Sequence, residues 1–109
     1  MKLIVGIVTE DDSRNLMEKL VEAGYRATLV SSTGSFLRQG NATFLIGVEE
    51  DRVDGVLKVF EKTCKKRVRE LPPLPSFLSR STEQQSESTK VEIGGAVVFV
   101  LDVERFIKI

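Results

Sequence analysis

One polar, glycine-punctuated segment carries the residue types that bind a phosphorylated heterocycle. Between residues 31 and 41, serine, threonine, glutamine and asparagine side chains supply hydrogen-bonding groups. Arg26 and Arg38 can pair with phosphate, and Phe36 and Leu37 can cover a base. A phosphate ligand that also contains a heterocycle needs this mixture of groups.

Glycines add backbone freedom to the same region. Gly34, Gly40 and Gly47 permit unusual backbone angles or the close approach of a ligand. No Gly-Lys-Ser or Gly-Lys-Thr follows, so the segment is not a P-loop. The alternative interpretation is that surface loops are in general rich in glycine, serine and asparagine.

The sequence offers only weak candidates for a catalytic nucleophile or a metal site. The chain has no histidine, so the commonest general base and metal ligand is missing. Cys64 falls on the apolar stripe of an expected helix, which favours a buried, inert thiol over a nucleophile. Residues 10–12 are acidic, but a helix N-terminus explains them better than a metal cluster does. We therefore expect no catalytic residue, no metal site and no cofactor.

Charge argues against nucleic-acid binding. Sixteen basic residues balance sixteen acidic ones, so the formal net charge is zero. The basic residues 65–69 are explained by a helix C-terminus followed by an edge strand with solvated charges. The apolar run at residues 3–8 is too short to cross a membrane and lacks a cleavage-like ending. We expect a cytoplasmic protein.

The elements that must position these groups follow from hydrophobic periodicity. Apolar runs predict strands, and apolar residues at helical spacing predict two helices, the first ending at Gly24. Thr9 and Asp12 form a weak capping-box pattern. The expected strands are 3–8, 25–32, 43–48, 90–93 and 96–103, and the expected helices are 10–23 and 50–66.

The order of the main elements is β-α-β-β-α-β, which predicts an α+β, ferredoxin-like sandwich in one domain, residues 1–109. A hairpin loop, 33–41, and a long loop, 72–89, connect them. The stretch 79–89 has almost no apolar anchors, so we expect it to be mobile.

One face of the predicted sheet packs on the two helices, and the other needs a cover. Period-two alternation implies that five apolar strand residues cannot all face the helices. A chain of 109 residues has nothing left to cover a second face, so we expect oligomerisation through it. The five residues are Leu29, Phe44, Ile46, Val98 and Val100.

Two stretches of sequence resemble the bacterial PII-like cyclic-di-AMP receptors. Residues 33–44 read Thr-Gly-Ser-Phe-Leu-Arg-Gln-Gly-Asn-Ala-Thr-Phe, and residues 91–100 read Val-Glu-Ile-Gly-Gly-Ala-Val-Val-Phe-Val. The resemblance spans nearly the whole chain and is weakest at residues 72–89. It implies a PII-like homotrimer and a non-enzymatic signal-transduction receptor that binds cyclic di-AMP between subunits and rearranges its loops.

The resemblance also implies the ligand-binding residues. One wall of the site matches Arg26, Ala27, Thr28, Asn41 and Gly47, and the enclosing residues match Phe36, Leu37 and Phe99. Gly34 is a further candidate for ligand binding. Lys108 stands where the family often has glutamine. A lysine cannot accept a hydrogen bond, but it can pair with phosphate.

Two other functions stay open. One is a nitrogen-sensing PII protein that binds ATP or another adenine nucleotide, although the short hairpin loop and the long loop after the second helix fit the cyclic-di-AMP branch better. The other is a small enzyme, which the fold alone does not exclude. The downstream protein partner is unknown.

We predict that the protein binds cyclic di-AMP more tightly than cyclic di-GMP, and that Asn41→Ala weakens cyclic di-AMP binding while leaving the fold intact. The amide of Asn41 matches the ring acceptor and exocyclic amine of adenine, whereas guanine places a carbonyl where that amine lies. An unpaired buried polar group costs about 1–3 kcal/mol, or roughly tenfold or more in affinity. Calorimetric titration measures this, with Arg26→Ala as the variant that weakens both dinucleotides evenly. Equal affinity of Asn41→Ala and the parent contradicts the assignment.

Overall fold

The computed structural model describes residues 1–32, 40–71 and 89–109. The predictions made for residues 33–39 and 72–88 lie outside this part of the chain, including the mobility expected for most of the stretch 79–89. In chain order the elements are β1 (Lys2–Thr9), α1 (Glu10–Glu22), β2 (Thr28–Ser32), β3 (Asn41–Val48), the 3₁₀ turn η1 (Glu50–Arg52), α2 (Val53–Cys64), β4 (Arg67–Leu71), β5 (Thr89–Ile93) and β6 (Ala96–Asp102).

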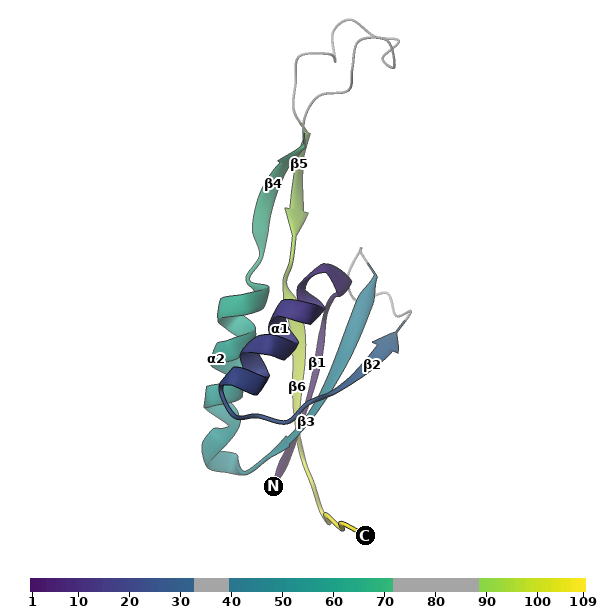
Figure 1. Ribbon diagram of the computed structural model, residues 1–109, viewed down its shortest axis with the longest axis vertical. Coiled ribbons are helices and arrows are strands. Elements are labelled where there is room, and N and C mark those ends of the chain that lie inside the picture. The colour runs from purple at the N-terminus through teal and green to yellow at the C-terminus, as the bar shows by residue number, and fades with distance from the viewer. Residues whose placement is uncertain (33–39, 72–88) are drawn as a thin grey trace, which may run out of the picture.

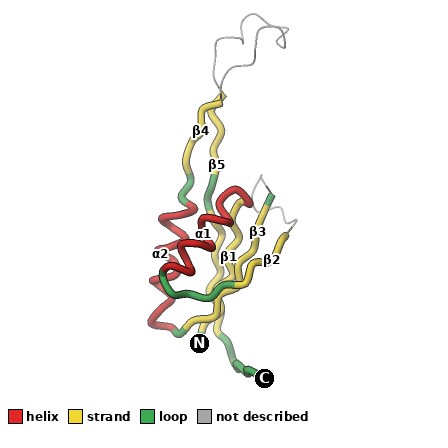
Figure 2. Tube along the Cα trace, viewed as in Figure 1, coloured by secondary structure: helices red, strands yellow, loops and turns green. Residues whose placement is uncertain are grey.

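Four of these strands form one antiparallel sheet in the order β2-β3-β1-β6. Both helices lie on the same side of this sheet (Figures 1 and 2). The chain therefore has the α+β, ferredoxin-like arrangement that the sequence predicts, with β2 and β6 as the two edges. β2 and β3 pair as the predicted antiparallel hairpin.

The buried core lies between the sheet and the helices. Its strand residues include Ile4, Val8, Phe44 and Ile46, and its helix residues include Leu16, Leu20, Val56, Phe60 and Cys64. The rings of Phe44 and Phe60 meet edge to face, with centroids 6.3 Å apart. Gly6 lies beneath Phe60, where a Cβ atom would collide with the ring, so glycine sets the distance between α2 and β1.

The pairing register of the strands shows which residues lie on each face of the sheet, and it differs from the expectation. Directly opposed residues of antiparallel strands share a face. Leu29 opposes Phe44, Phe44 and Val98 both oppose Gly6, and Ile46 and Val100 both oppose Ile4. All five residues therefore lie on the helix side, and the prediction that they divide between the faces is wrong.

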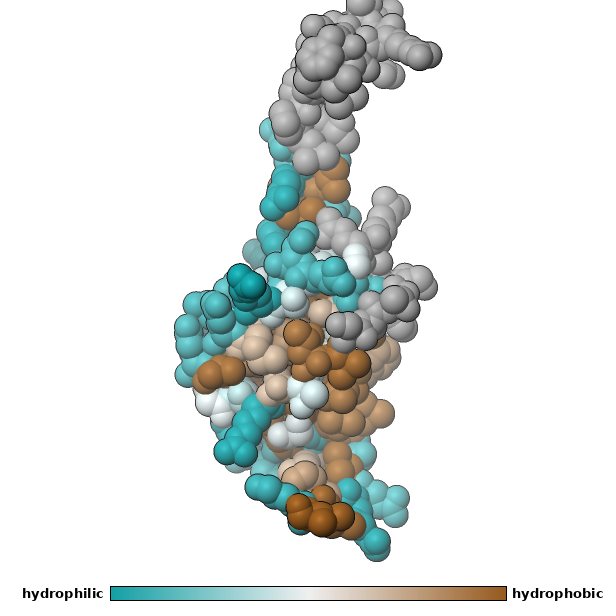
Figure 3. All heavy atoms as spheres, turned by 45° about the vertical axis from the view of Figure 1, so that its right-hand side comes forward, coloured by the Kyte–Doolittle hydropathy of each residue, from teal (hydrophilic) through white to brown (hydrophobic). Residues whose placement is uncertain are grey.

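The other face is nevertheless apolar, through a different set of residues. We call it the open face, because no described element packs on it. Partly buried or exposed side chains cover it in rows that cross all four strands. They are Leu3, Val5, Ile7, Thr28, Val30, Thr43, Leu45, Val97, Phe99 and Leu101. The space-filling view shows apolar surface gathered over the sheet side of the body, beside the polar surface of the helices (Figure 3).

The ends of the first helix are set by local chemistry. Gly24 has φ +87°, its N–H donates to Val21 O at 3.0 Å, and the N–H of Tyr25 donates to Leu20 O at 2.9 Å. This is a Schellman motif, so the predicted stop at Gly24 is confirmed. The capping box is wrong: Thr9 makes no side-chain cap, and its hydroxyl donates instead to the Asp12 carboxylate at 3.3 Å.

Two other predicted boundaries shift. The second helix spans Val53–Cys64 after the 3₁₀ turn η1, rather than 50–66, because Lys65 has extended ψ. The second strand begins at Thr28 rather than at residue 25, because Tyr25 belongs to the Schellman motif and packs against the core.

The basic segment after α2 does form a strand, but not at an edge of the main sheet. Among the described strands, β4 pairs only with β5, and the two form a ribbon that projects from the body (Figure 1). Gly94 and Gly95, with φ +82° and +92°, turn the chain from this ribbon into β6, as the sequence predicts. Gly95 N–H also donates to Cys64 O, which ties the start of β6 to the end of α2.

An ion pair anchors the base of the ribbon. Asp12, in the first turn of α1, is 6% exposed, and its Oδ1 accepts from Arg67 Nη2 at 2.6 Å. Arg67 Nη1 also donates to Lys65 O at 3.0 Å. The guanidinium passes so close to Gly94 that a Cβ atom there would lie 2.6 Å from Nη1. The charges of residues 65–69 are therefore not all solvated, since Arg67 neutralises a buried carboxylate.

We predict that Arg67→Met lowers the free energy of unfolding by about 1.5–3 kcal/mol, because it leaves the Asp12 carboxylate buried without its cation. Asp12→Asn combined with Arg67→Met should recover part of this loss, since the buried charge is then gone. Urea denaturation of the two single variants and the double variant gives the coupling energy. Additive losses would contradict the view that these groups stabilise each other.

Candidate functional site

The segment that leads into β2 is held in place by η1 and α2. The Arg52 guanidinium lies 4.6 Å from the centroid of the Tyr25 ring, a cation–π contact. Gly55 leaves room for the Tyr25 hydroxyl, where a Cβ atom would collide with it. Ala27 packs against the core. Arg26, between these two anchored residues, is exposed and available to a ligand.

A hollow of about 440 Å³ opens beside this segment. Its walls come from the start of β2, the last part of β3, the N-terminus and the chain after β6. The lining residues are Met1, Leu3, Arg26, Ala27, Thr28, Leu45, Gly47, Val103 and Phe106. Four residues predicted from the sequence, Arg26, Ala27, Thr28 and Gly47, thus share one concave surface, and its volume lies within the range of about 300–1,000 Å³ usual for small-molecule sites.

At Gly47 the backbone that lines this hollow is not covered by a side chain. Gly47 is exposed, and a Cβ atom built on it would meet only Met1 Sδ, at 3.8 Å. The fold therefore does not require glycine here. An approaching ligand could use the space that a side chain would fill.

Asn41 and Phe99 lie elsewhere on the sheet. Asn41 begins β3 and Gly47 lies six residues further along the same strand, so the two are about 20 Å apart. Phe99 lies in the same open-face row as Thr28, three strands away, or about 14 Å. Neither Asn41 nor Phe99 lines the hollow.

Asn41 is also buried. It is 1% exposed and opposes Thr9 at the end of β1. Gly40, beside it, accepts a hydrogen bond from Glu10 N–H at 2.8 Å. A ligand reaches the Asn41 amide only if the chain around it changes arrangement. Gly34, Phe36 and Leu37 lie outside the described residues.

Sequence reasoning missed the part of the hollow supplied by the two chain ends. Phe106, Val103 and Met1 line it. Val103 N–H donates to Met1 O at 3.1 Å, which brings the two ends together. No periodic pattern signals this contact; the apolar residues after β6 were the available clue.

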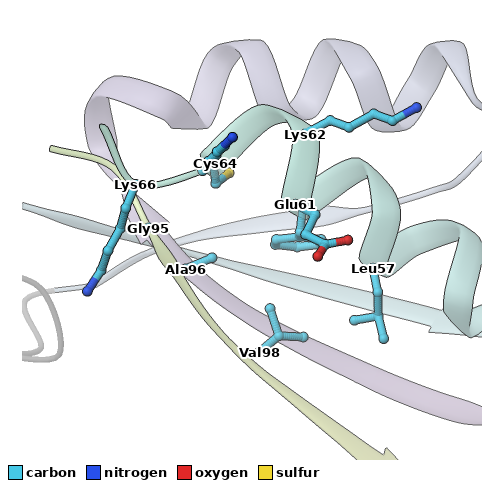
Figure 4. Close-up of a pocket in the computed structure, with 10 residues that line it drawn as sticks. Leu57, Glu61, Lys62, Cys64, Lys66, Gly95, Ala96 and Val98 are labelled. Carbon is cyan, nitrogen blue, oxygen red and sulfur yellow. The ribbon is translucent and has the colours of Figure 1, made fainter. Parts of the chain in front are cut away.

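A second groove, of about 780 Å³, separates α2 from the edge strand β6 (Figure 4). Phe60, Cys64 and Val98 contribute apolar surface to it, and Lys62 and Lys66 contribute cations. The ammonium groups of the two lysines point in different directions, so they do not converge on one ligand group (Figure 4). None of the predicted ligand-binding residues that the structure describes lines this groove.

Cys64 is the buried thiol that the sequence predicts. It is 1% exposed, and burial raises its pKa to about 12. The thiol is therefore protonated at neutral pH and is a poor nucleophile. Across residues 1–32, 40–71 and 89–109, no cluster of acidic or cysteine side chains is able to hold a metal ion. No helix of the same residues is long and apolar enough to span a membrane.

Comparison with known proteins identifies the family. The family model described as "Cyclic-di-AMP receptor" matches residues 1–109. The chain belongs to the cyclic-di-AMP receptor family. It is accordingly a signalling protein that binds cyclic di-AMP and is not an enzyme.

The fold of this receptor is similar to a solved structure. The crystal structure of a protein of unknown function from Pediococcus pentosaceus matches with a TM-score of 0.77 and 35% sequence identity, over 99% of this chain and 96% of that one. The match therefore covers both the main sheet and the projecting ribbon.

Proposed function

We propose that this receptor binds cyclic di-AMP at sites completed between neighbouring copies of a homotrimer. The observation that carries the proposal is the division of the predicted ligand residues. Arg26, Ala27, Thr28 and Gly47 line one hollow, whereas Asn41 and Phe99 lie well away from it on the same rigid sheet. A second chain can supply the missing groups.

The open face supports the oligomer. Phe99 and Leu101 are each 46% exposed and Val30 is 44% exposed, although they lie in rows with the partly buried residues of β1. A contiguous apolar surface of this kind is favourable to bury against another chain.

The two different edges of the sheet fit a ring of copies. β2 and β6 are the edges of the four-stranded sheet, and they differ in sequence. A contact between the β2 edge of one copy and the β6 edge of the next is head to tail, and such contacts form a ring when the rotation closes. In such a ring, the Arg26–Thr28 segment at the β2 edge faces the β6 strand of the next copy, which carries Phe99.

The chemistry of each group suggests its role. Arg26 is exposed and can pair with a phosphate of the ligand. The backbone at Gly47 allows a ligand to approach closely. Phe99 offers an apolar ring from the neighbouring copy. Asn41 reads the polar edge of adenine once the hairpin around it rearranges.

A connected set of contacts can relay the binding event. Glu10 N–H holds Gly40 at the end of the hairpin loop, and Asp12, half a turn further on in α1, holds Arg67 at the base of the ribbon. A change at the hairpin therefore acts on the same helix end that anchors β4 and β5. The ribbon offers a protein partner a surface that reports ligand binding.

The location that fits this role is the cytoplasm. A single cysteine, buried and free, matches a reducing compartment. The ligand of the family is a signalling nucleotide that must meet the receptor in the same compartment.

We predict that Gly47→Ala weakens cyclic di-AMP binding by about tenfold or more, because the new methyl group occupies the space used by the ligand. The thermal midpoint of unfolding should stay within about 2 °C of the parent, since the methyl group meets only Met1 Sδ. Calorimetric titration with cyclic di-AMP, cyclic di-GMP and ATP measures affinity and selectivity, and differential scanning calorimetry measures stability.

Two results would overturn the proposal. One is tighter binding of ATP than of cyclic di-AMP by the parent protein, which favours the adenine-nucleotide sensor. The other is a monodisperse monomer in sedimentation velocity at the concentrations used for titration, because a monomer cannot complete the site.

A further inference from the structure

We infer that Phe106 is a wall of the ligand hollow and stacks on a base of the bound dinucleotide. The inference rests on the proposed function and names a ligand-contacting residue that the sequence resemblance does not supply. Phe106 is the one aromatic residue among the described residues that line the hollow. Phe99, the aromatic residue expected at the site, does not line it.

The tail that carries Phe106 is fixed to the sheet just before it. Val103 N–H donates to Met1 O at 3.1 Å, and the Lys2 ammonium pairs with the Asp102 carboxylate. These two contacts join the end of β6 to the start of β1. They direct the chain after Asp102 across the end of the sheet where the hollow lies, and the C-terminus lies at this same end of the molecule (Figure 1).

The hollow combines the two kinds of surface that a nucleotide needs. Arg26 supplies a cation for phosphate, and Gly47 exposes its backbone. Leu3, Leu45 and Phe106 supply apolar surface. A flat apolar ring in such a wall can stack on a purine, and every base offers a face for this contact.

Exposure alone does not single out Phe106, but its position does. Phe106 is 64% exposed and the adjacent Ile107 is 65% exposed, yet only Phe106 lines the hollow. An aromatic ring left in water beside a concave surface gains free energy when a ligand covers it. Ile107 therefore provides a matched control with the same exposure and nearly the same place in the chain.

The test uses fluorescence, because the natural chain has no tryptophan. Phe106→Trp introduces the sole indole, and Ile107→Trp places the same group one residue away. We expect cyclic di-AMP to quench the emission of Phe106→Trp in a saturable way, with a midpoint equal to the calorimetric Kd. We expect little change in the emission of Ile107→Trp.

Affinity measurements separate stacking from general apolar contact. Phe106→Trp should bind cyclic di-AMP within about threefold of the parent, whereas Phe106→Ala and Phe106→Leu should bind about five- to 100-fold more weakly. Ile107→Ala should bind within about twofold of the parent. Sedimentation velocity of each variant should give the same oligomer as the parent.

The outcomes separate a failure of this inference from a failure of the proposed function. If the parent binds cyclic di-AMP and Phe106→Ala binds equally well, the assignment of Phe106 is overturned while the proposed function stands. The assignment is also overturned if Phe106→Ala loses the oligomer, because the ring then belongs to a subunit contact. If the parent does not bind cyclic di-AMP, both the proposed function and this inference fail.

Discussion

The rest of the structure depends on the presence of apolar residues on both faces of the central strand β1. Ile4 and Val8 point to the helices and are fully buried, while Leu3, Val5 and Ile7 alternate with them and point to the open face. Two helices cover one face only (Figure 2). A four-stranded sheet of this composition therefore needs a second cover, and in a chain of this length the economical cover is another copy.

The sheet also keeps the predicted ligand residues of one chain apart. The ligand residues lie along strands that hydrogen bonds hold rigidly, so Asn41 and Gly47 cannot approach each other by a small movement. Distances of this kind are fixed by the strand rise and the register, not by loop conformation. In the proposed ring of copies, different ends of the sheet come together, and the proposed site forms when the open face is covered.

Much of the fold follows from local patterns in the sequence. Gly24 after an amphipathic helix predicts the Schellman stop, and Val56, Phe60 and Cys64 at helical spacing predict the buried stripe of α2. The faces of the sheet do not follow in this way. β1 is a continuous apolar run, so the sequence cannot say which side each residue takes, and the five residues expected to divide between faces all lie on one.

The contacts that escaped prediction join residues far apart in the chain. Arg67 pairs with Asp12 across 55 residues, and Val103 bonds to Met1 across almost the whole chain. Neither contact has a periodic signature, because each depends on how completed elements pack. Arg26, Ala27, Thr28 and Gly47 could be named as candidates from the sequence because they belong to recognisable motifs, whereas Phe106 lines the hollow only through one such long-range contact.

The most direct test of a shared site is complementation between two defective chains. Arg26→Ala and Asn41→Ala chains are unfolded, mixed in equal amounts, refolded together and titrated with cyclic di-AMP. If each site takes Arg26 from one copy and Asn41 from its neighbour, random mixing restores about a quarter of the sites to parental affinity. Binding in the mixture that equals the sum of the two separate variants, with no restored sites, would contradict the account.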